Sequence, residues 1–249
     1  SMFARNTYYN ESFSMGTGEA DTCDPTEPLG PVPADCTYWN LLADADPDTA
    51  RMSAALAFAV RSPHPVDPAD QPAGEKVDPN FELTRGMWTE DKDLIRPTGV
   101  TLHGTRFTTW GNGIQWEVTA SAAMAMLHFD SVYGGLTDQG KTVDLKQRVE
   151  AVRDSLRLLL GMYKGVPASV LGGNRDAWVQ WTFKSDKWRR DVPFPGGTDT
   201  GASWTYLRYN HVASTAWTGL FFLYQAEAGA VLNENANPLS VPKKAQGQA

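Results

Sequence analysis

Apolar residues recur at helical spacing along most of this chain. Over residues 143–163 they return every three or four positions, while charged side chains fill the opposite positions. That spacing predicts a surface helix with one buried stripe. Two shorter helices are predicted over residues 35–42, where Asp35 can cap the first turn, and over residues 50–60, which follow an Asp-Pro start signal.

Two other helical segments, residues 114–129 and 211–229, are apolar almost all round. Helices of this kind must be covered by protein on several sides. Buried and amphipathic helices therefore alternate along the chain, a pattern that antiparallel helical hairpins with one inner and one outer member produce. A simple four-helix bundle would instead make every helix amphipathic. The fold class that we predict is mainly α, with antiparallel helical hairpins, aromatic-rich loops and a few short strands.

The remaining segments show little helical periodicity. Residues 3–19 alternate aromatic and polar side chains, which favours a hairpin or extended structure, and the proline-rich residues 62–79 predict a surface loop. Residues 165–210 are rich in aromatic side chains, so we expect short strands and loops that line one face or a lid over the helix ends. Because no flexible linker divides the sequence, residues 1–239 are predicted to form a single domain and residues 240–249 a disordered tail.

The acidic balance of the chain excludes several kinds of partner. The formal net charge is −7 over 249 residues, and lysines and arginines do not cluster. Binding to nucleic acid or to anionic membranes is therefore not expected. No apolar run in the sequence approaches the roughly 20 residues that a membrane helix needs.

No cofactor or metal site is expected from the sequence. Nucleotide, flavin and redox motifs are absent, and the histidines show no pair at metal-ligand spacing. One of them, His128, lies three helical turns after Glu117 and is expected to be a satisfied core residue. The histidines are His64, His103, His128 and His211.

Cys23 and Cys36 are the only cysteines, and they bracket a segment rich in proline. A disulfide between them would close a short loop that has no core of its own and would stabilise it by about 3 kcal/mol. Such a bridge favours an exported protein, secreted or periplasmic. The alternative is two free buried thiols in a cytosolic protein.

The segment from Trp110 to Phe129 gives the strongest indication of function. A glycine-rich turn leads into a helix of small residues, and the first helical turn carries Trp116 and Glu117. Together with Trp110, these side chains offer a flat apolar face beside an acid, which is what a sugar ring requires. The alternative is a buried tryptophan pair beside a glutamate that backbone amides satisfy at the helix start.

Three passages of the chain match the pattern of one known family. They are Asp35-Cys36-Thr37-Tyr38-Trp39 with Leu41-Leu42-Ala43, Trp116-Glu117-Val118-Thr119-Ala120, and Ala213-Ser214-Thr215-Ala216-Trp217 with Asn237-Pro238. In order and rough spacing they resemble the C-terminal half of six-hairpin glycosidase-like proteins, over residues 3–239. The resemblance implies an (α/α) toroid, in which helical hairpins form a ring, and a carbohydrate-active function.

The sequence also departs from the family pattern. Val118 stands where the pattern has glycine and Ser121 where it has glutamine, and this could reshape or abolish a catalytic pocket beside Glu117. About five helices are predicted, whereas a toroid of six hairpins has about twelve. We therefore expect either that a preceding half of the toroid is missing or that the chain is a reduced relative that pairs with another copy or chain.

The resemblance implies a glycoside hydrolase that acts on an oligo- or polysaccharide through two carboxylates. Glu117 is the expected general acid, and the alternative role of Asp35 is that of a helix cap. The candidates for the second carboxylate are Asp35, Glu90, Asp91 and Asp199. The expected sugar platforms are Trp88, Trp110, Trp116, Trp178 and Trp204. The alternatives are a non-catalytic glycan-binding or structural assembly module that retains the toroid shape, and a structural subunit whose aromatic face is a protein interface.

Overall fold

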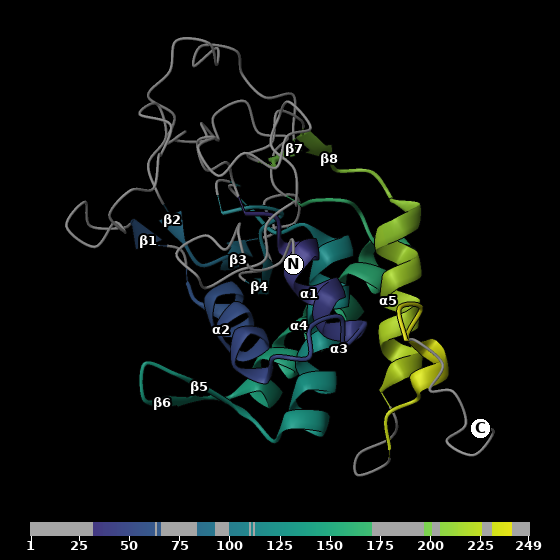
Figure 1. Ribbon diagram of the computed structural model, residues 1–249. Helices are drawn as coiled ribbons and strands as arrows, with labels where there is room; N and C mark the ends of the chain where they lie inside the picture. Colours follow the sequence, from purple (N-terminus) through teal and green to yellow (C-terminus); the bar gives the residue numbers. More distant parts are fainter. Residues whose placement is uncertain are drawn as a thin grey trace, which may run out of the picture.

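The structure is a computed structural model that describes residues 32–62, 64–65, 84–92, 100–109, 111, 113–170, 197–200, 205–225 and 231–240. About half of these residues lie in five α-helices, and four short antiparallel hairpins supply the strands. The fold of this part of the chain is therefore mainly α, as predicted (Figure 1). None of its helices is both long and apolar enough to cross a lipid bilayer.

The helices lie close to their predicted positions. Those over residues 35–42, 50–60 and 143–163 are confirmed, whereas the two apolar helices end elsewhere than predicted. α3 continues to Tyr133, where Gly134 adopts a φ of 78° in the left-handed region and ends it. The bounds are α1 Ala34–Leu42, α2 Thr49–Val60, α3 Trp116–Tyr133, α4 Leu145–Tyr163 and α5 Val212–Tyr224, followed by the 3₁₀ turn η4 Glu234–Ala236.

The strands form two-stranded hairpins at the edges of the helical core. They are β1 His64–Pro65 with β2 Thr84–Arg85, β3 Trp88–Lys92 with β4 Thr101–Thr105, β5 Leu136–Asp138 with β6 Lys141–Val143, and β7 Gly197–Asp199 with β8 Thr205–Leu207. β4 packs directly onto α3 and α4. Gly104 permits this contact, because a Cβ atom there would lie 2.6 Å from Thr119 Oγ1.

α3 is the central helix of the molecule. Of its 18 residues, 12 are buried, and most of these are alanine, serine, threonine or methionine. α1, α4 and α5 all pack against it, as does β4. Small side chains allow this close approach on several faces. The prediction that this apolar helix is covered on several sides is thus confirmed.

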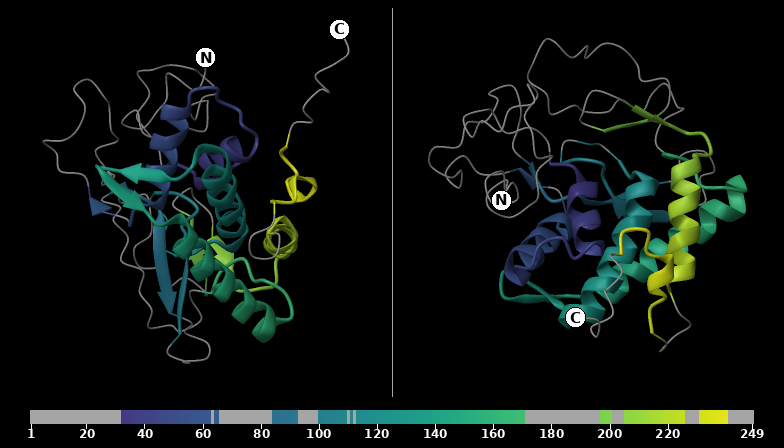
Figure 2. Two further views of the ribbon diagram at one scale, coloured as in Figure 1. Left: turned by 90° about the horizontal axis from the view of Figure 1, so that it is seen from below. Right: turned by 45° about the vertical axis from the view of Figure 1, so that its right-hand side comes forward.

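α1, α3 and α5 run in the same direction (Figures 1 and 2). Their N-terminal ends bring Asp35 and His211 close enough to Glu117 to act on its charge. Their C-terminal ends meet around His128, which contacts both the loop after α1 and the end of α5. α2 and α4 run in the opposite direction, so α1–α2 and α3–α4 are antiparallel hairpins.

α5 leaves one face uncovered, contrary to the prediction for this apolar helix. It buries Ser214, Thr218, Phe221 and Tyr224 against the core. On another face Val212 is 85% exposed and Leu223 64% exposed, and Ala216 and Gly219 between them are exposed as well. These four residues form one stripe, because they follow one another at spacings of four, three and four residues. We call them the α5 stripe.

The start of α1 differs from the prediction that Asp35 caps it. Pro33 is the residue before the helix and makes no side-chain cap, while the Ala34 amide donates to Phe107 O at 2.8 Å. Asp35 lies inside the first turn, where its Oδ1 accepts a hydrogen bond from Cys36 N at 2.8 Å. The predicted capping role is wrong because the chain enters the helix one residue earlier and strand-like contacts satisfy its first amide.

The expected disulfide is not formed. Cys36 carries a free, partly buried thiol, and Cys23 lies outside the described residues. Burial, with the adjacent charge of Asp35, raises the pKa of the Cys36 thiol to about 12. Export, which was inferred from the bridge, stays a prediction.

Candidate active site

The N-terminal ends of α1, α3 and α5 bring three titratable side chains together. Asp35 and Glu117 each occupy the first turn of a helix, and His211 is the residue that precedes α5. His211 Nδ1 lies 3.9 Å from Glu117 Oε2. The charge of Asp35 also acts on Glu117. Two of the acids singled out from the sequence are therefore neighbours, although different helices carry them.

Gln115 fixes the turn that presents Glu117. Its Oε1 accepts from Val118 N at 2.6 Å, and its own backbone amide donates to Thr105 O of β4 at 3.0 Å. The side chain is fully buried, and its Nε2 has no hydrogen bond of normal geometry. The Gln115 amide nevertheless lies near enough to Glu117 to lower its pKa. A buried hydrogen-bond donor thus stands beside the candidate acid.

Glu117 is shielded from water but not sealed off, since its side chain is 19% exposed. Burial raises the pKa of Glu117, His211 opposes this rise, and the negative charge of Asp35 adds to it. A carboxyl group in such surroundings keeps its proton to a higher pH than an exposed glutamate does. This is the property that a general acid requires.

Asp35 is desolvated as well. Burial raises the pKa of its carboxyl group, while hydrogen bonds from the backbone amides of Cys36 and of Asp35 itself and from the Cys36 thiol limit the rise. Asp35 therefore has hydrogen-bond donors that favour its ionised form, whereas its charge disfavours ionisation of Glu117. Two neighbouring carboxyl groups in unequal surroundings can divide the roles of acid and base.

Half-buried aromatic side chains lie on the elements that carry this group or contact them. Tyr206 meets His211 edge-on at 6.0 Å between ring centroids, and Phe107 meets Tyr206 edge-on at 5.7 Å. Trp39 of α1 and Trp217 of α5 stack on one another with centroids 5.8 Å apart and an angle of 16° between their planes. All five side chains are half-buried, so they retain some surface for a ligand.

Trp39, Trp217 and His211 were not proposed from the sequence as site residues. One signal for Trp39 was available, because it follows Asp35 by four residues and therefore lies on the same face of α1. Nothing in the sequence signals that Trp217 stacks on Trp39, because only the packing of α1 and α5 around α3 creates that contact.

Two of the predicted tryptophan platforms, Trp88 and Trp116, are described by the structure, and both are covered by protein. Trp116 is fully buried in the core. Trp88 is 6% exposed, and the guanidinium of Arg148 lies 4.8 Å above its ring. Trp110, Trp178 and Trp204 are outside the described residues. In the described part, the half-buried rings that remain as candidate platforms are Tyr206, which contacts His211, and the stacked pair Trp39 and Trp217.

Of the other candidate carboxylates, Glu90 and Asp91 have partners of their own. Glu90 is exposed on β3 and lies 3.4 Å from His103 Nδ1. Asp91 is buried and accepts a hydrogen bond from Ile114 N at 2.7 Å. Burial raises the pKa of Asp91 to about 7, although Ile114 N and Arg106 lower it. Asp91 thus supports the loop before α3. Asp199 lies in β7, and its side chain is outside the described residues.

The two departures from the family pattern face inward. Val118 is 1% exposed, and Ser121 is fully buried with its Oγ donating to Val118 O at 3.0 Å. Both side chains are therefore engaged inside the protein and offer nothing to a ligand. Glu117, which stands between Trp116 and Val118, is the half-buried residue of this turn.

The comparisons with known proteins add no relative. No family model matches the chain, and neither do any curated protein or solved structure. Within the described residues, no group of three or more metal-ligating side chains could hold a metal ion. The family resemblance therefore depends on the three sequence passages alone.

Proposed function

We propose that this protein is a glycoside hydrolase, with Glu117 as general acid and Asp35 as the second carboxylate. The observation that supports this most strongly is that two carboxyl groups, far apart in the sequence, are both desolvated at the N-terminal ends of parallel helices, and that the charge of Asp35 raises the pKa of Glu117. Acid and base catalysis on a glycosidic bond requires such a pair. No cofactor is part of the proposal.

The proposed fold is part of an (α/α) toroid. In this proposal α1, α3 and α5 belong to the inner ring, since they are parallel and their N-terminal ends converge, and α2 and α4 are outer helices. The central position of the apolar α3 between α1 and α5 supports this assignment. The substrate would then approach from the end where Asp35, Glu117 and His211 lie.

In the proposed reaction, Glu117 gives its proton to the glycosidic oxygen as the bond breaks. Its raised pKa keeps it protonated until then, and nearby His211 stabilises the carboxylate that forms. Asp35 acts on the opposite side of the sugar. It attacks the anomeric carbon if the two carboxylates are about 5 Å apart, and activates a water if they are about 6.5–9.5 Å apart.

Trp39 and Trp217 are the proposed sugar platforms of the described part. Each presents a half-buried ring, Trp39 about one turn after Asp35 on α1 and Trp217 less than two turns after His211 on α5, and an aromatic face binds the C–H face of a sugar ring. They take this role in place of Trp88 and Trp116, whose rings are covered by protein.

Substitution of Glu117 by Gln tests the proposal. With hydrolysis screened on nitrophenyl glycosides and on polysaccharides by release of reducing ends, we expect Glu117→Gln to lower turnover by about a hundredfold or more, because the acid is lost. Glu90→Gln is the matched control, since it makes the same change on an exposed strand, and it should keep full activity. The wild-type rate should fall as the pH rises through the raised pKa of Glu117, because only its protonated form is a donor.

Full turnover in Glu117→Gln would exclude Glu117 as the acid. Binding of an oligosaccharide without hydrolysis, lost on Trp39→Ala, would instead support the non-catalytic glycan-binding module.

One observation favours a second candidate function, that of an assembly module. The α5 stripe exposes apolar surface over four helical positions on a helix without any charged residue. Exposed apolar stripes of this kind typically mark a protein interface. The partner would be a second copy of the chain or the remaining hairpins of the toroid, and the oligomeric state in solution tests the first of these.

A further inference from the structure

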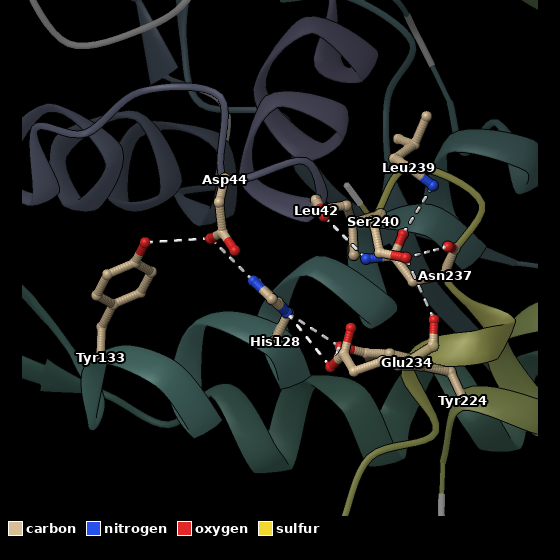
Figure 3. Close-up of polar contacts among 9 residues, drawn as sticks. All are labelled: Leu42, Asp44, His128, Tyr133, Tyr224, Glu234, Asn237, Leu239 and Ser240. Carbon is tan, nitrogen blue, oxygen red and sulfur yellow. Dashed lines mark hydrogen bonds and ion pairs between the residues drawn. The ribbon is translucent and has the colours of Figure 1, made fainter. Parts of the chain in front are cut away.

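A second polar cluster lies at the opposite end of the helices from Glu117 (Figure 3). Its centre is His128 of α3, which is 5% exposed and, as predicted, a satisfied core residue. Asp44 reaches it from the loop after α1, Tyr224 from α5 and Glu234 from η4. The cluster therefore joins four elements that are distant in the sequence.

Both ring nitrogens of His128 and both tyrosine hydroxyls of the cluster have defined partners. Tyr133 Oη donates to Asp44 Oδ1 at 3.2 Å, and His128 Nε2 lies 3.0 Å from the same oxygen. On the other side, Tyr224 Oη donates to Glu234 Oε1 at 2.9 Å and lies 3.1 Å from His128 Nδ1. Figure 3 shows the imidazole ring between these oxygens.

The hydrogen-bond donors and acceptors around His128 determine which of its ring nitrogens carry hydrogen. A carboxylate only accepts hydrogen bonds, and a tyrosine hydroxyl has one proton to give. Because Tyr224 gives its proton to Glu234, its oxygen is left to accept from His128 Nδ1. Asp44 in turn accepts from Nε2. With the hydrogens assigned in this way, both ring nitrogens of His128 donate, as they do in an imidazolium ion.

The extra proton belongs on His128 rather than on Glu234. The side chains of Glu234 and Asp44 are 51% and 45% exposed, so water stabilises both as carboxylates. Imidazole also binds a proton more strongly than an ordinary carboxyl group does. A cation suits this end of the helices, because the last carbonyl groups of a helix carry partial negative charge.

Other charged side chains in this region are engaged elsewhere. Asp130 lies on another face of α3, with Lys146 Nζ of α4 at 3.6 Å. Asp46, in the same loop as Asp44, binds Arg51 at 2.7 Å. In the part of the chain that the structure describes, the titratable groups that face His128 or its carboxylate partners are thus Asp44, Tyr133, Tyr224 and Glu234.

The cluster holds residues 231–240 against the helices. Asn233 N donates to Tyr224 O at 3.0 Å. Asn237 Nδ2 donates to Leu42 O, at the end of α1, at 2.8 Å (Figure 3). Glu234 lies between these two anchors in the sequence, and its contacts with Tyr224 and His128 link η4 to α3 and α5.

We propose that His128 is a pH-dependent lock for residues 231–240. As an imidazolium ion it binds Asp44 and the Tyr224–Glu234 pair together and holds the segment in place. When the ring loses a proton, one nitrogen faces an acceptor without a hydrogen, and two carboxylates remain without the cation between them. The stabilisation is thus present at low pH and is lost as the pH rises. This inference does not depend on the hydrolase proposal.

NMR of the full chain with ¹⁵N-labelled histidine tests the proposal directly. At about pH 6 both ring nitrogens of His128 should be protonated, and at about pH 9 one of them should have lost its hydrogen. Amide exchange over residues 231–240, corrected for the intrinsic effect of pH, should be about tenfold or more faster at about pH 9. A neutral His128 at the lower pH would overturn the proposal, as would exchange that does not change with pH.

Three variants separate the lock from a general effect of pH. His128→Gln retains a polar side chain that cannot be protonated in this range, so it should abolish the pH dependence of exchange over residues 231–240. His103→Gln is the control, because His103 lies on β4 and its imidazole Nδ1 lies 3.4 Å from the exposed Glu90, and it should leave that dependence intact. If His128→Gln does not fold, Asp44→Asn retains the histidine and should weaken the dependence. An unchanged dependence in Asp44→Asn would also overturn the proposal.

Discussion

At the scale of single residues, Asp35 links two groups of different chemistry. Its charge raises the pKa of Glu117 on the neighbouring helix and that of the Cys36 thiol next to it. Both effects arise because Asp35 is removed from water, which otherwise screens a charge. The thiol therefore reports on the ionisation of Asp35 without any need for a substrate.

Asp35→Asn should make Cys36 more reactive. Without the adjacent negative charge, the pKa of Cys36 falls from about 12, more thiolate forms at a given pH, and alkylation by iodoacetamide becomes faster by about threefold or more. The rate is measured in a Cys23→Ser background, so that one thiol reacts. Asp154→Asn on the exposed face of α4 is the control and should not change the rate. An unchanged rate in Asp35→Asn would show that Asp35 is not ionised beside Cys36.

The sequence indicated Glu117 and Asp35 because helix starts have local signals. Glu117 follows a glycine-rich turn, and Asp35 precedes a run of apolar residues. The same local pattern predicted a sugar platform at Trp116, which is adjacent to Glu117 in sequence but is fully buried in the core. His211 and Trp217 could not be found this way, since their roles arise only when α5 packs beside α3.

At the scale of elements, β4 packs closely against the first turns of α3, beside the candidate site. Thr119 Oγ1 donates to Gln115 O at 2.7 Å and accepts from Thr105 N at 3.0 Å. Gly104 lies directly against this threonine. Thr119 thus links the strand β4 to Gln115, the residue that caps α3 and precedes the turn with Glu117.

Gly104→Ala should destabilise the protein by about 1–3 kcal/mol, because the added methyl group would lie 2.6 Å from Thr119 Oγ1 and 2.7 Å from Ile114 Cγ2. Gly161→Ala in α4 is the matched control. Its Cβ meets nothing within 4 Å, so it should stabilise the helix by about 0.5–1 kcal/mol. Urea unfolding monitored by circular dichroism measures both changes. Equal stability of the two variants would show that β4 does not pack on α3 as described.

The helices themselves were predictable because their apolar spacing is regular. α4 shows this most clearly, since Leu145, Val149, Val152, Leu156 and Leu159 are all buried. The faces of α5 were not predictable, because a helix that is apolar all round does not indicate which of its sides has a partner in the same chain. The start of α1 was displaced by one residue because Phe107, distant in sequence, satisfies its first amide.

At the scale of the whole molecule, α5 carries an exposed apolar face. α3 packs against both α1 and α5. No element among the described residues covers the α5 stripe, in which Val212 is 85% exposed and Leu223 64% exposed. A toroid that continued beyond α5 would cover this stripe, and so would a second copy.

Leu223→Glu should shift the protein toward the monomer if the α5 stripe joins two copies. A charge in an apolar interface costs several kcal/mol, so the dissociation constant should rise by about a hundredfold or more in analytical ultracentrifugation. Val132→Glu is the control, because Val132 is 53% exposed on α3 outside the stripe, and it should not change the association. A wild-type protein that stays monomeric at all concentrations would exclude a second copy as the partner.

The bond from Asn237 to Leu42 O spans 195 positions of the chain. On the ribosome, α1 can therefore form early, but its last turn stays open to water until nearly all of the described polypeptide has been synthesised. Contacts between such distant positions slow the search for the native state. A nascent chain that stalls before residue 237 would expose an unfinished first helix to chaperones and proteases.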